Sequence, residues 1–184
     1  MGRVHEAFIA ASLIVFLLGT AAAIAIPHRL PRQVSMSASS ARDLIIPVDG
    51  VAAAALVDTW GAARSQGRKH EGIDIVARAG TPVRATAAGT IAKLFHSVRG
   101  GTTVYEFARD RKLIFYYAHL ERYAAGLHEG AAVEQGQLIA YVGATGNATT
   151  PHLHFEIQRP AAPGQWWHGA AFDPYQSLES ARLP

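Results

Sequence analysis

The chain has 184 residues, which is room for one globular domain and an N-terminal extension. It contains no cysteine, which excludes thiolate catalysis, thiolate metal ligands and disulfide bonds. The formal net charge of +3 is spread along the chain, and its one dense run of charges, residues 109–112, is typical of a solvated hairpin tip, so we expect no nucleic-acid partner.

The first predicted element is an apolar stretch of 20 residues, Ala7–Ile26, which follows a short head of residues 1–6. At 1.5 Å per residue, a helix of this length crosses the roughly 30 Å of hydrocarbon in a bilayer. Because the stretch is longer than the apolar region of a typical signal peptide, we expect an uncleaved transmembrane helix that anchors the chain in the cell membrane. The small residues at 21–25 leave open the alternative that the segment is cleaved and the protein secreted.

Residues 27–43 are rich in serine, arginine and proline without apolar periodicity, and we expect a linker there. From residue 44 onward, turn residues separate short β-type runs, which are 44–46, 73–76, 90–95, 102–108, 113–118, 137–142 and 152–158. This spacing predicts a mostly β fold, a compact antiparallel sheet domain over residues 44–158, with a helical turn near residues 121–126. We expect residues 159–184 to form an irregular tail packed on the domain.

Two chemically useful side chains, His70 and Asp74, lie just before and within one of these runs. A spacing of four would align them on a helix, but Gly72 and the β-favouring run 73–76 indicate a bend that leads into a strand. In a fully extended chain the two would lie roughly 13 Å apart, too far to share a metal ion whose ligand bonds are about 2 Å. The bend at Gly72 is therefore needed if they are to act together.

Two later runs also present histidines. His119 follows the run 113–118, and the end of a strand is a usual place for a polar group of a site. In the last run, alternation puts His152, His154 and Glu156 on one face of the strand, opposite an apolar face. A histidine of this polar face, together with His70 and Asp74, would make a plausible three-ligand zinc site.

Together these segments resemble the lysostaphin/LytM-type zinc metalloendopeptidases, enzymes that cut the peptide part of peptidoglycan. The matching stretches are 68–75, 80–83 with 88–89, 117–120, 136–139 with 142–146, and 151–156. They occur in the family's order within residues 44–158, and an ordered set is more specific than any one tripeptide.

The resemblance implies a Zn²⁺ ion held by His70, Asp74 and His154, with a fourth position for water, as catalytic zinc sites require. It implies that His119 and His152 are catalytic and flank the water and the scissile carbonyl without binding the metal. The sequence has no HExxH motif that would supply a glutamate base, so we expect a histidine to hold or move the proton.

Glu156 has two open interpretations, a partner that orients a histidine and a solvated strand carboxylate. For the whole chain we expect a zinc endopeptidase that hydrolyses peptide bonds in stem peptides or cross-links of peptidoglycan. The alternative is a catalytically silent adaptor of the same fold that activates another cell wall hydrolase. Such relatives typically lack zinc ligands or catalytic histidines, whereas here all five positions are filled. The sequence indicates neither the bond that is cut nor any protein partner.

The implied substrate and the charge pattern disagree about topology. Three arginines, Arg29, Arg32 and Arg42, follow the apolar segment while only Arg3 precedes it, which by the positive-inside rule favours a cytoplasmic domain. Peptidoglycan lies outside the cytoplasmic membrane. Because the implied substrate lies there, we expect the catalytic domain in the periplasm or cell wall space.

Overall fold

The computed structural model describes residues 44–180. The predicted head, transmembrane helix and linker, which together span residues 1–43, lie outside this range and stay predictions. Within residues 44–180, no helix combines the length and the apolar character that crossing a membrane requires.

Most of the regular structure in this range is short β-strands. The strands are β1 (Ile73–Val76), β2 (Pro82–Arg84), β3 (Gly89–Ser97), β4 (Gly101–Ala108), β5 (Ile114–Tyr123), β6 (Ala132–Val133), β7 (Leu138–Val142), β8 (His152–Arg159) and β9 (Ala170–Phe172). The helices are the 3-10 turns η1 (Ala53–Ala55) and η2 (Ser65–Gly67) and the α-helix α1 (Pro174–Glu179).

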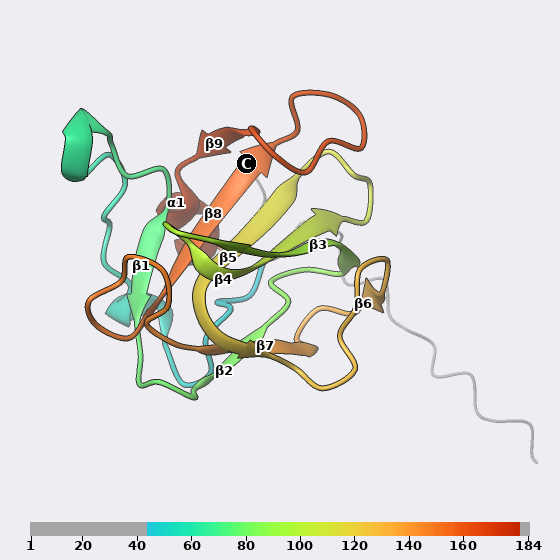
Figure 1. The fold of residues 1–184 in the computed structure, drawn as a ribbon, viewed down its shortest axis with the longest axis horizontal. Helices are drawn as coiled ribbons and strands as arrows, with labels where there is room; N and C mark the ends of the chain where they lie inside the picture. The colour runs from blue at the N-terminus through green and yellow to red at the C-terminus, as the bar shows by residue number, and fades with distance from the viewer. Residues whose placement is uncertain (1–43, 181–184) are drawn as a thin grey trace, which may run out of the picture. The chain divides into compact units, whose positions relative to one another are not determined.

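All strand pairs are antiparallel, and the main path of the sheet runs β1-β8-β5-β4-β3-β6. β7 leaves this path to pair with β2 and with the C-terminal part of β5, and β9 pairs with the C-terminal end of β8. Figure 1 shows β8 between β1 and β5, with β2 and β7 across one end of them. The prediction of a mostly β, antiparallel sheet domain is confirmed.

β5 changes its partner in the middle of the strand. Residues 114–118 pair with β8, and residues 120–123 pair with β7. Between them, His119 has a φ of +60°, a left-handed conformation that a histidine rarely adopts. Its backbone N–H donates to the Gly100 carbonyl at 2.8 Å. His119 therefore lies at a bend inside β5, and the expectation that it ends a strand is wrong.

The two faces of β8 differ as the alternation predicts. Leu153, Phe155 and Ile157 are fully buried in the core, while the intervening polar side chains are partly exposed. Burial of one large apolar side chain is worth about 1.5–3 kcal/mol. A slip of one residue would exchange the two faces and expose all three, so the core fixes which side chains of β8 face outward.

Two local predictions are corrected by the structure. Residues 121–123 continue β5 instead of starting a helical turn, because they pair with β7. The tail that begins at residue 159 is not wholly irregular, since it contains β9 and α1. Asp173 caps α1 by accepting a hydrogen bond from the Tyr175 N–H at 2.9 Å, and Pro174 fits the first helical position.

Candidate active site

The two segments that carry the predicted metal ligands lie side by side in the sheet. Asp74 in β1 is the direct cross-strand partner of His154 in β8. His70 reaches the same place because the chain bends at Gly72. A Cβ atom at Gly72 would lie 2.5 Å from the Phe155 carbonyl oxygen, so a glycine is required for this close approach.

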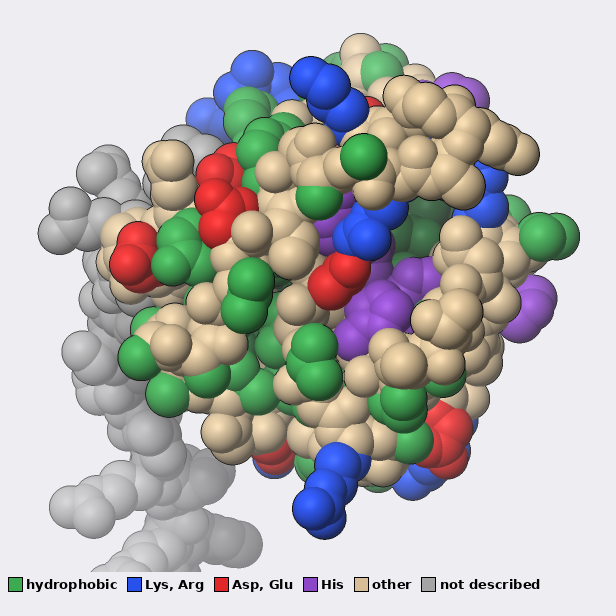
Figure 2. Space-filling model, turned by 90° about the vertical axis from the view of Figure 1, so that its left-hand side faces the viewer, with side chains coloured by type: hydrophobic (Ala, Val, Ile, Leu, Met, Phe, Trp, Pro, Cys, Tyr) green, Lys and Arg blue, Asp and Glu red, His purple; other side chains and the backbone are tan. Residues whose placement is uncertain are grey.

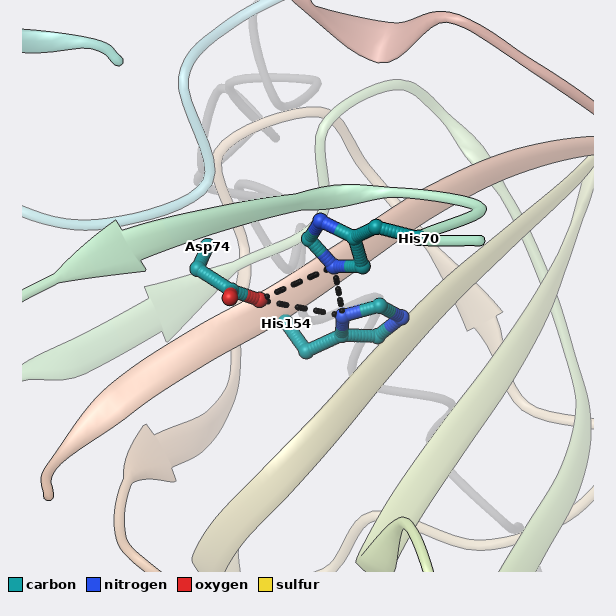
Figure 3. A group of neighbouring side chains, drawn as sticks. All are labelled: His70, Asp74 and His154. Atoms are coloured by element: carbon teal, nitrogen blue, oxygen red, sulfur yellow. Dashed lines mark hydrogen bonds and ion pairs between the residues drawn. The ribbon is translucent and has the colours of Figure 1, made fainter. Parts of the chain in front are cut away.

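One atom from each of these three side chains points to a common centre, as Figure 3 shows. His70 Nε2 lies 2.8 Å from His154 Nδ1 and 3.1 Å from Asp74 Oδ1. His154 Nδ1 lies 3.1 Å from the same carboxylate oxygen. The structure thus brings together the three residues predicted to be ligands.

The two imidazoles of this cluster are held by their outer nitrogens. His70 Nδ1 lies 2.8 Å from the Thr59 carbonyl oxygen, and His154 Nε2 lies 2.7 Å from Glu156 Oε1. A carbonyl and a carboxylate accept hydrogen bonds, so these outer nitrogens donate and the inner ones, His70 Nε2 and His154 Nδ1, keep a lone pair in the neutral ring. Of the two interpretations of Glu156, this contact favours the one in which it orients a histidine.

Asp74 brings a negative charge to the cluster. Burial raises the pKa of the Asp74 carboxyl, but its interactions with His154 and His70 outweigh burial and hold that pKa well below its usual range. The second oxygen, Oδ2, accepts a hydrogen bond from the Arg64 guanidinium. The Asp74 backbone N–H donates to the Thr59 hydroxyl at 3.1 Å. Oδ1 therefore faces the two imidazoles as a fixed anion.

This arrangement fits a divalent metal ion. Two lone pairs and an anionic oxygen repel one another at these separations unless a cation or a proton lies between them. A proton on His154 can supply the positive charge. Burial lowers the pKa of His154, but the neighbouring Asp74 and Glu156 outweigh burial and raise it to about 9. Two imidazole nitrogens and a carboxylate oxygen are also a ligand set of catalytic zinc, whose tetrahedral ligand atoms lie about 3.4 Å apart. The donor set fits zinc after the ligand atoms move apart by about 0.3 to 0.6 Å.

Two further histidines, the predicted catalytic pair His119 and His152, stand beside this cluster. Their ring centroids lie 4.8 Å apart, and the His119 centroid lies 5.9 Å from that of His154. His119 Nδ1 donates to the Thr145 carbonyl and His152 Nδ1 to the Thr150 carbonyl, both at 2.8 Å. In both neutral rings the lone pair is therefore on Nε2.

Burial keeps the His119 imidazole in its neutral form. Burial lowers its pKa to about 4, and the neighbouring His152 and His154 add to this effect against the bond to Thr145. The ring is consequently uncharged at neutral pH, with a lone pair that can accept a hydrogen bond. Among the described residues, the group that could hold a metal ion consists of His70, Asp74 and His154 and includes neither His119 nor His152.

These side chains line a cleft of about 370 Å³, within the range of roughly 300–1,000 Å³ that is typical of ligand sites. Figure 2 shows histidine side chains in a hollow of the surface, with basic and acidic side chains next to them. The other lining residues come from the segment before β1, from β5 and β8, from the turn at residues 99–100 and from the loop at residues 147–149.

Sequence reasoning missed the groups that orient the site. Thr59, Thr145 and Thr150 act mainly through backbone carbonyls, which any residue type could supply, so no residue pattern marks them. Arg64 lies in an irregular segment without periodicity. Of these four, only Thr145 falls inside a stretch that carries the family resemblance.

Comparisons with known proteins agree with this geometry. The model of peptidase family M23 matches residues 68–174. The L-Ala--D-Glu endopeptidase of Bacillus subtilis (strain 168) is 36% identical over 132 residues, which cover 66% of this chain and 39% of that protein. The peptidoglycan DD-endopeptidase ShyC of Vibrio cholerae is 38% identical over 90 residues, which cover 49% of this chain and 20% of that protein.

The solved structures show the same relationship. The catalytic domain of the antimicrobial peptidase lysostaphin from Staphylococcus simulans superposes with a TM-score of 0.57 and 31% identity, covering 66% of this chain and 89% of that domain. The chain therefore matches nearly all of an isolated catalytic domain. By contrast, it spans less than two fifths of the full length of the two curated relatives named above.

Proposed function

Because the chain belongs to peptidase family M23, we propose that it is a zinc-dependent endopeptidase that hydrolyses peptide bonds in peptidoglycan stem peptides or cross-links. The observation that carries the proposal is the cluster of His70, Asp74 and His154, three metal-ligating groups whose acceptor atoms converge beside two more histidines. The relatives whose names specify peptidoglycan bonds support the choice of substrate.

In this proposal His70 Nε2, Asp74 Oδ1 and His154 Nδ1 hold the metal ion. A zinc ion bound there lowers the pKa of a water molecule to about 7 and polarises a substrate carbonyl. Thr59 and Glu156 keep the two imidazole rings in the tautomers that present a lone pair to the cluster. The Arg64 guanidinium donates a hydrogen bond to Asp74 Oδ2, the oxygen that does not face the cluster.

His119 and His152 are the proton-handling groups. Their Nδ1 atoms are committed to backbone carbonyls, so proton transfer takes place at Nε2. Neutral His119 accepts a hydrogen bond from the attacking water and helps to orient it toward the carbonyl. A protonated His152 Nε2 would donate to the oxyanion that develops on the attacked carbonyl, and the cleft around both rings limits competing water.

The test uses the zinc-loaded full-length protein and purified peptidoglycan, with the released fragments identified by mass spectrometry. We expect soluble fragments with newly formed amino and carboxyl ends at a single type of peptide bond. If the zinc-loaded protein releases nothing yet stimulates a second hydrolase, the adaptor alternative replaces the proposal.

The same proposal places the domain outside the cytoplasmic membrane, tethered by the predicted transmembrane helix of residues 7–26. Protease added to spheroplasts is expected to digest the domain, while the untreated protein fractionates with membranes. Protection of the domain until the membrane is dissolved would contradict this topology.

A further inference from the structure

Basic side chains without acidic partners gather around the cleft. Arg68 and Lys69 directly precede His70, and Arg99 precedes Gly100, whose carbonyl accepts the His119 backbone N–H. None of these three cations forms an ion pair with a carboxylate of residues 44–180. Arg68 has one long hydrogen bond, to Ser65, and its buried Nε has no partner.

Four other basic residues of the domain differ from these three. Arg84, Lys93, Arg109 and Arg122 lie away from the cleft, and each of them pairs with a carboxylate. Arg78, Arg111, Lys112 and Arg159 also lie outside the cleft without a carboxylate partner among residues 44–180. What distinguishes Arg68, Lys69 and Arg99 is therefore their position beside the histidines of the cleft. They leave positive charge where a substrate would lie.

The acidic groups of the cleft do not cancel this charge. Asp74 is paired with Arg64, and Glu156 is bonded to His154, so both are already engaged. Glu71 is the remaining acidic residue that lines the cleft. The cleft lining holds four basic residues, Arg64, Arg68, Lys69 and Arg99, against three acidic residues, Glu71, Asp74 and Glu156. A divalent ion at the cluster would add further positive charge. A cleft with this balance attracts anionic groups.

Resting on the proposed endopeptidase function, we propose that Arg68, Lys69 and Arg99 select peptide substrates that carry free carboxylates close to the bond that is cut. Guanidinium and ammonium groups donate charge-assisted hydrogen bonds to carboxylates. A carboxamide or a glycine-only peptide offers no negative charge to these groups. The same cleft should therefore disfavour amidated peptides and neutral oligoglycine.

The cations occur at two places along the site. Arg68 and Lys69 adjoin a predicted metal ligand, whereas Arg99 adjoins the turn that supports His119 and contacts Asn147 through its carbonyl at 3.0 Å. A bound peptide that passes over the histidines would meet positive charge near both. The preference for carboxylates should therefore weaken in steps as the charges are removed singly and together.

The test compares two substrates that differ only in charge, native peptidoglycan and the same preparation with its carboxyl groups converted to carboxamides. An exposed ion pair of up to about 1 kcal/mol corresponds to about fivefold in rate. We expect the zinc-loaded full-length protein to release fragments about tenfold faster from the native wall and to leave a neutral oligoglycine peptide uncut.

One variant carries both Arg68→Gln and Arg99→Gln. The control is Arg109→Gln, which alters an arginine that is paired with a carboxylate away from the cleft. The double variant should lose about fivefold on the native wall, since Lys69 remains, and change less than about twofold on the amidated wall. The control should change neither rate. Added salt should slow the wild type on the native wall more than it slows the double variant.

Equal rates on native and amidated wall, or equal loss by the double variant on both, would overturn the proposal while leaving the endopeptidase function intact. If the protein cuts neither wall, the endopeptidase function fails instead. Co-sedimentation with the two preparations then still decides the carboxylate preference, since equal binding to both would overturn it.

Discussion

Two buried carboxyl groups of this domain have opposite ionisation, and the difference shows how the site is made. Glu106 in β4 is completely buried, and its only hydrogen-bond partner within residues 44–180 is the Tyr117 hydroxyl, which donates to Oε2 at 2.8 Å. Burial raises its pKa to about 8, so it is mostly neutral at pH 7. Asp74 is also partly buried, but its interactions with the neighbouring His70 and His154 keep its pKa low.

Burial alone therefore produces a neutral structural acid, and burial beside convergent imidazoles preserves a charged group that can bind a cation. Glu106 is enclosed by the sheet and does not line the cleft. Asp74 is therefore expected to bind a cation, whereas Glu106 is expected to have only a structural role in the core. Each of the following experiments tests one side of that assignment.

The largest effect is expected when the two carboxylates are neutralised in turn. Asp74→Asn should lose zinc and slow hydrolysis by at least about 10³-fold, because the anionic ligand is removed. Glu106→Gln should keep a full zinc complement and near-normal hydrolysis, since Glu106 is already neutral. Zinc content by atomic absorption and fragment release from peptidoglycan give both readouts. Full zinc in Asp74→Asn would refute its role as a ligand.

The next effect concerns a group that would act without binding metal. His119→Ala should keep its zinc and slow turnover by about 10²- to 10⁴-fold, the usual contribution of acid–base assistance. His128→Ala is a suitable control, because this histidine is exposed and, in the described part of the chain, bonds only to the Glu129 carbonyl. Turnover and zinc content of both variants are measured together. Wild-type turnover in His119→Ala would make this residue structural.

A smaller effect is expected at the residue that orients His154. Glu156→Gln should weaken zinc binding by about 10- to 100-fold, as loss of a carboxylate behind a ligating imidazole typically does. Competition with a chromogenic chelator measures the dissociation constant. Glu134→Gln, which alters an exposed ion pair with Arg109, is the control. Equal affinities in the two variants would show that Glu156 does not support His154.

How much of this could be predicted depends on the kind of residue pattern involved. The alternation of β8 predicted which side chains face the cleft, because strand periodicity and core burial act locally and together. The bend at Gly72 followed from the distance that His70 and Asp74 must bridge. The antiparallel sheet followed from the spacing of the runs.

Long-range backbone contacts left no such pattern. The bend of β5 at His119 arises because one strand pairs with both β8 and β7, which its own sequence does not reveal. The carbonyls of Thr59 and Thr145 orient histidines regardless of their side chains. The capped helix α1 could have been found from the Asp-Pro pair at 173–174, a signal that the prediction of an irregular tail overlooked.

The last of these experiments separates the two carboxyl groups by the pH dependence of stability. The folded-state pKa of Glu106 lies above its unfolded value of 4.5, so its contribution to stability is complete below that value and is lost as the pH rises through about 8. The loss can reach about 1.4 kcal/mol per pH unit in this window. Urea unfolding at about pH 5 and about pH 8 should show a steeper loss in the wild type than in Glu106→Gln. Parallel losses would mean that Glu106 is ionised in the fold.

The central claim is that His154 holds the metal while His152, two residues away on the same face of β8, handles protons. The most direct test measures the zinc content of His154→Ala and His152→Ala, purified side by side and equilibrated with the same zinc buffer. The account predicts that His152→Ala keeps one zinc ion per chain and loses most of its hydrolysis, while His154→Ala loses both. A full zinc complement in His154→Ala, or loss of zinc from His152→Ala, would contradict it.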